Sequence, residues 1–366
     1  VGIHSQYKNK SPTKFLLPRF NLCVLCSVET FYIFVGNNRK THMQQNRVSH
    51  YDLAGGILIL WIMAFHPMSQ NWVFDPEDVR VVLPYLVFSM PWFFYKAGHF
   101  FKVMDCREGV KKDVRKLLFP FLKWTAVGYA IYLVMQLIDG TFTWHSCVVE
   151  ALDVFSVYGY IPVDVPAWFL LSLMVVRIAA RYLIKWKVPA EVCTVVCIGI
   201  GFGIHLSGNN LPFYLSNIPM GLAFFMVGYK YGRFENNRGL FALCAVGYIA
   251  FLVFGPSVVG HHRNVLLSGY YLLWPLYAYC GIVVFNNLCR LAVGAVARAG
   301  KHFLDPLMFI GRHTLTLLVT HAFVYMPWVH YTTLTPWQTV ICTYICYAIF
   351  LTPLMVWEWK KSRRPV

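Results

Sequence analysis

The chain has 366 residues, of which 58% are hydrophobic and only 13% are charged, and its mean hydropathy is +0.52. A soluble domain carries about 25% charged residues, so this composition excludes an ordinary soluble protein and predicts an all-α polytopic membrane protein. The formal net charge of +16 requires no nucleic acid to explain it, because Lys and Arg collect in the cytoplasmic loops of membrane proteins.

The first 46 residues form a basic extension that differs from the rest of the chain. Its apolar part is interrupted by a proline and two charged residues, whereas a membrane span needs about 20 continuous apolar residues. We expect the extension to result from an upstream in-frame start, with Met43 as the true start; a helix on the membrane surface is the alternative. Cys23 and Cys26 have the spacing of a metal-binding pair, but no second pair lies near them, so we expect no metal site.

Residues 47–366 contain ten apolar segments, and we predict that they form one domain of ten transmembrane helices. The predicted spans cover residues 53–74, 80–100, 117–138, 164–184, 188–206, 213–232, 239–256, 267–286, 306–327 and 336–357. Basic residues cluster after every second span, and the alternate loops are acidic or almost uncharged. This alternation places both termini in the cytoplasm. The longest outer loop is expected to hold a short amphipathic helix over residues 148–157.

The first predicted span contains the most informative stretch, residues 51–66, with the sequence YDLAGGILILWIMAFH. On a helix, Asp52 and His66 lie within roughly 40° of each other and about 21 Å apart along the axis. Titratable groups inside the membrane usually serve function, because hydrocarbon does not solvate them. Pro67 cannot donate a backbone hydrogen bond, so we expect the helix to bend or break at His66. A histidine that simply bonds to a neighbouring helix is the alternative.

Five further side chains are candidates for function. Lys96 lies near the cytoplasmic end of the second span, where it either extends to the headgroups or forms a cationic entrance with Lys112 and Arg115. His321 lies midway along the ninth span, and a hydrogen-bonded core histidine is an equally good interpretation. Trp168 begins the fourth span, where an aromatic residue of the membrane interface is the default expectation.

Five segments, in order, resemble acyltransferase family 3, whose members are membrane enzymes that O-acylate cell-surface polysaccharides and lipid-linked sugars. They are YDLAGGILILWIMAFH, PWFFYKAGHFF at 91–101, KDVRKLLFP at 112–120, PAWFLLSLMV at 166–175, and the stretch 310–321 that begins IGRHTL and ends in His321. The resemblance covers about residues 47–357.

The resemblance implies a multi-pass enzyme of the inner (cytoplasmic) membrane that uses acyl-CoA, most simply acetyl-CoA, as a co-substrate without a bound cofactor. Lys112, Arg115 and Lys96 would meet the phosphates of the donor at the cytoplasmic face. His66 would act as general base on an acceptor hydroxyl, or would carry the acyl group itself. A glycan or glycolipid would be the acceptor, and the other candidate contacts to substrate are Asp52, Trp168 and His321.

One position departs from the family pattern. The basic residue that the family carries three positions after the aspartate is replaced here by Gly55. Lys96 or Arg115 would have to supply that charge, or the protein is an inactive relative. A transporter or flippase of polysaccharide is a further alternative, which would use the same spans. The identity of the acyl group, the acceptor sugar and the presence of a homo-oligomer are left open by the sequence.

Overall fold

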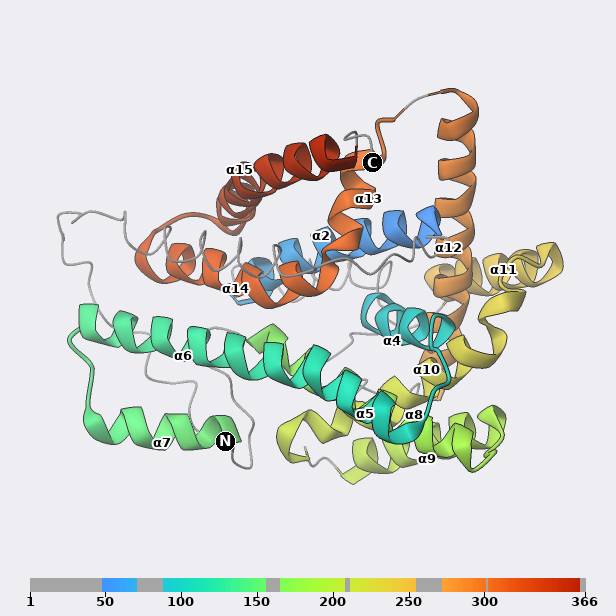
Figure 1. Cartoon of the computed structure of the whole chain (residues 1–366), viewed down its shortest axis with the longest axis horizontal. Coiled ribbons are helices and arrows are strands. Elements are labelled where there is room, and N and C mark those ends of the chain that lie inside the picture. Colours follow the sequence, from blue (N-terminus) through green and yellow to red (C-terminus); the bar gives the residue numbers. More distant parts are fainter. Residues whose placement is uncertain are drawn as a thin grey trace. The chain divides into compact units, whose positions relative to one another are not determined.

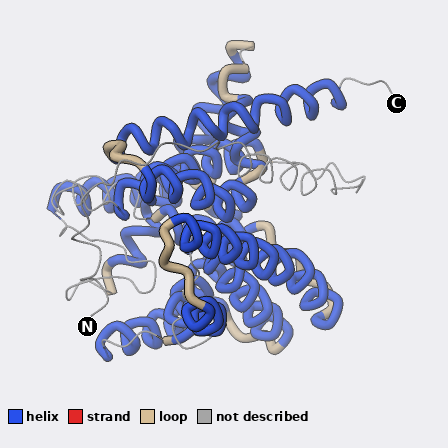
Figure 2. Tube along the Cα trace, turned by 90° about the vertical axis from the view of Figure 1, so that its left-hand side faces the viewer, coloured by secondary structure: helices blue, strands red, loops and turns tan. Residues whose placement is uncertain are grey.

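The computed structural model describes residues 48–70, 88–155, 165–207, 211–254, 272–300 and 302–362. The N-terminal extension, with Met43, Cys23 and Cys26, lies outside the described residues. The described residues form helices, joined by loops and turns, and include no strand (Figure 2). The predicted all-α class is therefore confirmed.

The helices follow the chain in an order that matches the apolar segments (Figure 1). Their bounds are α2 Ser49–Gln70, α4 Ser89–His99, α5 Cys106–Asp113, a π-helical turn η1 Val114–Leu118, α6 Phe119–Ile138, α7 Trp144–Phe155, α8 Trp168–Lys185, α9 Ala190–Ser207, α10 Ile218–Tyr231, α11 Arg238–Phe254, α12 Trp274–Arg298, α13 Asp305–Arg312, α14 Thr314–Tyr331 and α15 Pro336–Ser362. Short 3₁₀ turns are η2 Val165–Ala167, η3 Pro212–Asn217 and η4 Gly232–Phe234.

Each of the ten predicted segments overlaps a helix, although not every helix is long and apolar enough to cross a membrane by itself. In the described part of the chain, four helical stretches are long and apolar enough to cross a membrane. They are Cys106–Ile138, Ala190–Ser207, Trp274–Arg298 and Trp337–Trp357. The pair α13 and α14 makes a fifth if it is counted as one broken span. In contrast, α8 carries three basic residues and α10 has only 14 residues. The structure thus shows a membrane protein with four or five candidate spans.

The expected position of the helix break differs from the structure. α2 continues through Pro67 to Gln70 as one helix, so a break at His66 is wrong. Pro67 leaves the carbonyl oxygen of Met63 without its usual backbone donor, but this single loss does not end the helix. The break lies instead in the ninth predicted span, where His313 leaves the helical conformation and the axes of α13 and α14 form an angle of 85°.

The bend at His313 lets α13 pack closely against α2. A Cβ atom added at Gly56 would lie 2.1 Å from the carbonyl oxygen of Leu307, and one at Gly311 would lie 1.7 Å from that of Asp52. The two backbones therefore touch at a point where only glycine fits. This contact orients α2, which carries His66.

A helix is present where the amphipathic helix was predicted: α7 begins at Trp144, before the predicted start at residue 148, and ends at Phe155. Residues 156 and 157 lie outside the described residues. Trp144, Val148 and Leu152 repeat every four residues and are all exposed. Residues at this spacing share one face of a helix, so α7 presents an apolar stripe outward.

Candidate active site

The structure brings together two of the predicted site residues, His66 of α2 and His321 of α14. Nδ1 of His66 lies 2.6 Å from Nε2 of His321, and the two rings are nearly parallel, with centroids 4.9 Å apart and planes inclined by 11°. His321 is fully buried, and His66 is half-buried. They are 255 residues apart in the chain, so no local sequence pattern pairs them.

The hydrogen bonds determine which ring nitrogens carry protons in the neutral pair. Nδ1 of His321 lies 3.0 Å from the carbonyl oxygen of Leu317, and a carbonyl can only accept, so this Nδ1 carries a hydrogen. Nε2 of His321 is then an acceptor, and Nδ1–H of His66 donates to it. It follows that Nε2 of His66 holds the lone pair and is the nitrogen able to accept a proton or attack an electrophile.

Helix α15 holds the two histidine-bearing helices in place through a pair of tyrosines. The Tyr344 hydroxyl donates to the carbonyl oxygen of Leu60 in α2 at 2.6 Å. One turn later the Tyr347 hydroxyl donates to Oγ1 of Thr320 in α14 at 3.0 Å. α15 is therefore bonded to both helices next to the histidine pair.

Lys96 of α4 lies beside the position that Gly55 leaves without a side chain. Its Nζ donates to the carbonyl oxygen of Tyr51 at 3.3 Å and lies 4.9 Å from the centroid of the Trp92 ring. A Cβ atom added at Gly55 would be 3.4 Å from the same Nζ. The ammonium group of Lys96 thus occupies the surroundings of residue 55, and half-buried Asp52 precedes it by one helical turn.

The remaining candidates lie on other elements. Lys112 at the end of α5 and Arg115 in the π-helical turn are exposed. Trp168 begins α8 as predicted, but it is buried and packs edge-on against Phe169 at a centroid distance of 6.0 Å. It does not have the exposed position that a residue of the membrane interface would have.

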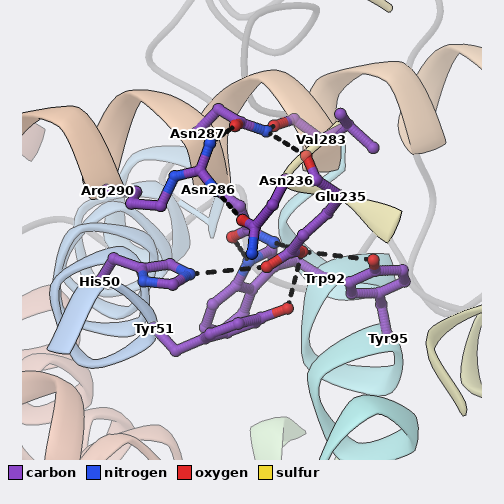
Figure 3. Close-up of polar contacts among 10 residues, drawn as sticks. All are labelled: His50, Tyr51, Trp92, Tyr95, Glu235, Asn236, Val283, Asn286, Asn287 and Arg290. Carbon is purple, nitrogen blue, oxygen red and sulfur yellow. Dashed lines mark hydrogen bonds and ion pairs between the residues drawn. The ribbon is translucent and has the colours of Figure 1, made fainter. Parts of the chain in front are cut away.

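A buried carboxylate that the sequence analysis missed joins several helices near the start of α2 (Figure 3). Glu235, which follows η4 and is 3% exposed, accepts hydrogen bonds from the Tyr51 hydroxyl at 2.8 Å, from Nδ2 of Asn286 at 3.1 Å and from the Tyr95 hydroxyl at 3.3 Å. Nε2 of His50 lies 3.5 Å from its other oxygen. These residues come from α2, α4 and α12.

The charge of Glu235 is maintained by these donors. Burial raises the pKa of this carboxyl, but hydrogen bonds from His50, Tyr51 and Asn286 outweigh it, so the pKa is lower than its ordinary value of 4.5. Glu235 stands out in the sequence as an acid within a basic loop, but the sequence contains no sign of the partners, which lie 51 or more residues away.

A family model described as an acyltransferase domain matches residues 49–357. The chain belongs to acyltransferase family 3. The match begins in the first turn of α2 and ends within α15, so the helices that carry and support His66 and His321 all belong to this domain. Comparisons with curated proteins and with solved structures give no match. The protein is thus a membrane acyltransferase, and the predicted family and enzyme class are confirmed.

Proposed function

We propose that this acyltransferase moves an acetyl group from cytoplasmic acetyl-CoA to a hydroxyl of a cell-surface polysaccharide or lipid-linked sugar. The observation that carries the proposal is the His66–His321 pair, which presents a basic nitrogen with a defined tautomer between apolar helices. Acyl transfer to a hydroxyl requires a group that removes the hydroxyl proton, and a neutral imidazole suits that task near neutral pH.

The proposed reaction begins when Nε2 of His66 takes the proton of the acceptor hydroxyl. The hydroxyl oxygen attacks the thioester carbonyl carbon, the C–S bond breaks, and the CoA thiolate leaves with the proton returned by His66. Meanwhile Nε2 of His321 accepts a hydrogen bond from Nδ1–H of His66 and keeps that ring oriented as positive charge develops on it. In the alternative route, Nε2 of His66 attacks the thioester carbonyl carbon, the C–S bond breaks and CoA thiolate leaves. The acetylated ring then passes the acetyl group to the acceptor hydroxyl, whose proton goes to the thiolate, and rapid quenching would leave acetylated protein.

The placement of the donor follows from charge and from the proposed topology of ten spans with both termini in the cytoplasm. Lys112 and Arg115 are exposed cations next to the beginning of α6, and phosphate groups form strong hydrogen bonds with such cations. Lys96 is the third cation of the proposed donor path. His66, near the far end of α2, would then meet an acceptor arriving from the outer side of an inner membrane.

The test uses the full protein in vesicles, with labelled acetyl-CoA inside and crude surface glycan outside. We expect label on the glycan and free CoA inside. His66→Ala should reduce both by about 100-fold or more, the usual effect of losing a general base. His205→Ala, at the end of α9, is the matched control. Equal transfer by His66→Ala would refute the proposal, and glycan movement without CoA release would indicate a transporter.

A further inference from the structure

A buried acid, Asp113, lies between Lys112 and Arg115, two of the three proposed donor-binding cations. Asp113 is 2% exposed, whereas its neighbour Lys112 and Arg115, two positions later, are both exposed. Its Oδ1 accepts from Nε of Arg177 at 2.9 Å, and its Oδ2 accepts from Nη2 of Arg181 at 2.8 Å. Within one short segment, therefore, the acid is buried against α8 while the two cations are exposed.

The contact between Asp113 and α8 is tightly enclosed. Arg181 is 3% exposed, and the Phe101 ring lies 4.7 Å from its Cζ and 5.2 Å from Cζ of Arg177. A Cβ atom at Gly109 would lie 2.2 Å from Cζ of Arg181, so the guanidinium group of Arg181 lies directly against the backbone of α5. Nε and Nη1 of Arg181 make no hydrogen bond within the described residues. Asp113 is therefore the hydrogen-bonding and charge partner of Arg181 there.

The π-helical turn η1 starts directly after Asp113 and spans Val114–Leu118. Its closing hydrogen bond runs from the N–H of Phe119 to the carbonyl oxygen of Val114, one residue wider than in an α-helix. One inserted residue turns the following helix by about 100°. This turn allows Asp113 to face α8 while Phe121 and Trp124 of α6 remain buried. π-turns of this kind occur often at functional sites.

We propose that Asp113, Arg177 and Arg181 form a positioning clamp that holds Lys112 and Arg115 in the geometry that meets the phosphates of the acyl donor. This proposal rests on the proposed function, because the donor-binding role of the two cations comes from there. The clamp acts through those cations. A positioning role of this kind changes the affinity for the donor and leaves the chemistry at His66 unchanged.

The experiment measures kcat and the KM for acetyl-CoA in Asp113→Asn, which keeps the shape of the side chain and removes its charge. We expect KM to rise about tenfold, the effect of one weakened charge-assisted contact, with kcat within about twofold of the unaltered protein. The unaltered protein should also lose affinity for acetyl-CoA as salt screens the phosphate contacts. Asp113→Asn should show a flatter salt dependence. Glu191→Gln, which removes the same charge from the exposed ion pair with Lys230, is the control.

A second variant is needed in case Asp113→Asn does not fold, because a buried cation left without its acid destabilises a protein strongly. Asp113→Asn with Arg181→Gln removes both charges together, and the same rise in KM is expected in that folded double variant. Unchanged KM, or a loss in kcat alone, in either folded variant would overturn the proposal. If neither variant folds, the cluster of Asp113, Arg177 and Arg181 serves folding, and the proposal of a positioning clamp is overturned.

Lys112→Ala and Arg115→Ala, measured in parallel, separate this proposal from the one on which it rests. If these two variants raise KM and the Asp113 variants do not, only the clamp is wrong. If Lys112→Ala and Arg115→Ala leave KM unchanged, the assignment of the donor-binding cations is wrong.

Discussion

At His66 the proposed chemistry depends on which ring nitrogen carries the proton, and a second histidine decides this. The Leu317 carbonyl fixes the proton of His321 on Nδ1, and His321 in turn fixes the proton of His66 on Nδ1. Without His321, the Nδ1–H of His66 would lose this acceptor, which orients the ring. In the proposed mechanism, the role of His321 is therefore to position the reacting histidine.

The first prediction concerns His321. His321→Ala should lower kcat by roughly 10- to 100-fold with little change in the KM for acetyl-CoA, because the base remains but is no longer oriented. His321→Gln keeps an amide oxygen that can accept from His66 and should recover part of the rate. Steady-state release of CoA measures both variants. A rise in KM at constant kcat would indicate that His321 contacts the donor instead.

The second prediction addresses Gly55 and Lys96. Because Nζ of Lys96 lies beside the position of a Gly55 side chain, we expect Lys96→Met to reduce activity by about tenfold or more, and Gly55→Lys with Lys96→Met to restore most of it. Gly55→Lys alone places two cations together and should not increase activity.

The activity of these variants decides whether Lys96 supplies the charge that is missing at Gly55 or whether the protein is impaired by its absence. If Lys96→Met is harmless, the cation has no role. If Gly55→Lys alone raises activity strongly, Lys96 does not replace the missing charge, and the present sequence is an impaired member of the family. CoA release in vesicles distinguishes these outcomes.

At the scale of elements, the glycine contact between α2 and α13 determines where His66 lies. The third prediction is that Gly56→Ala lowers the free energy of unfolding by about 1–3 kcal/mol, the usual effect of forcing an atom into a filled site, because its Cβ would lie 2.1 Å from the Leu307 carbonyl oxygen. Gly199→Ala in α9 is a matched control, since its Cβ would meet nothing within 4 Å in the described structure. Thermal unfolding in lipid measures both, and equal stability would contradict the close packing.

At the scale of the whole molecule, Glu235 joins segments from α2, α4, α12 and the loop before α11. Its pKa is lower in the folded protein than its ordinary value of 4.5. Folding therefore favours the charged form, so the stabilisation is present above about pH 4.5 and is lost as the pH falls through the lower, folded-state pKa.

The fourth prediction follows from the lowered pKa of Glu235 in the folded protein. Glu235→Gln should reduce the free energy of unfolding at pH 7 by roughly 1–3 kcal/mol, because hydrogen bonds to a charged acceptor are replaced by weaker ones. The difference from the unaltered protein should shrink as the pH falls below 4.5. Thermal unfolding in lipid from pH 7 to pH 3 tests this, and a difference that is independent of pH over that range would contradict an ionised Glu235.

Local sequence determined the helical class and the order of the helices, because a hydrophobic run is a property of a single segment. It also identified His66 as a candidate functional residue, because the cost of a titratable group in hydrocarbon is likewise a property of one segment. The five family-like segments likewise identified the family from residues alone. Only the tertiary structure decided that His321 faces His66, that Lys96 lies beside Gly55, and that Glu235 and Asp113 are buried among donors from other helices. Periodicity tells which face of a helix is apolar, but it does not tell which distant helix covers that face. The partners that give these side chains their chemistry are set by helix packing.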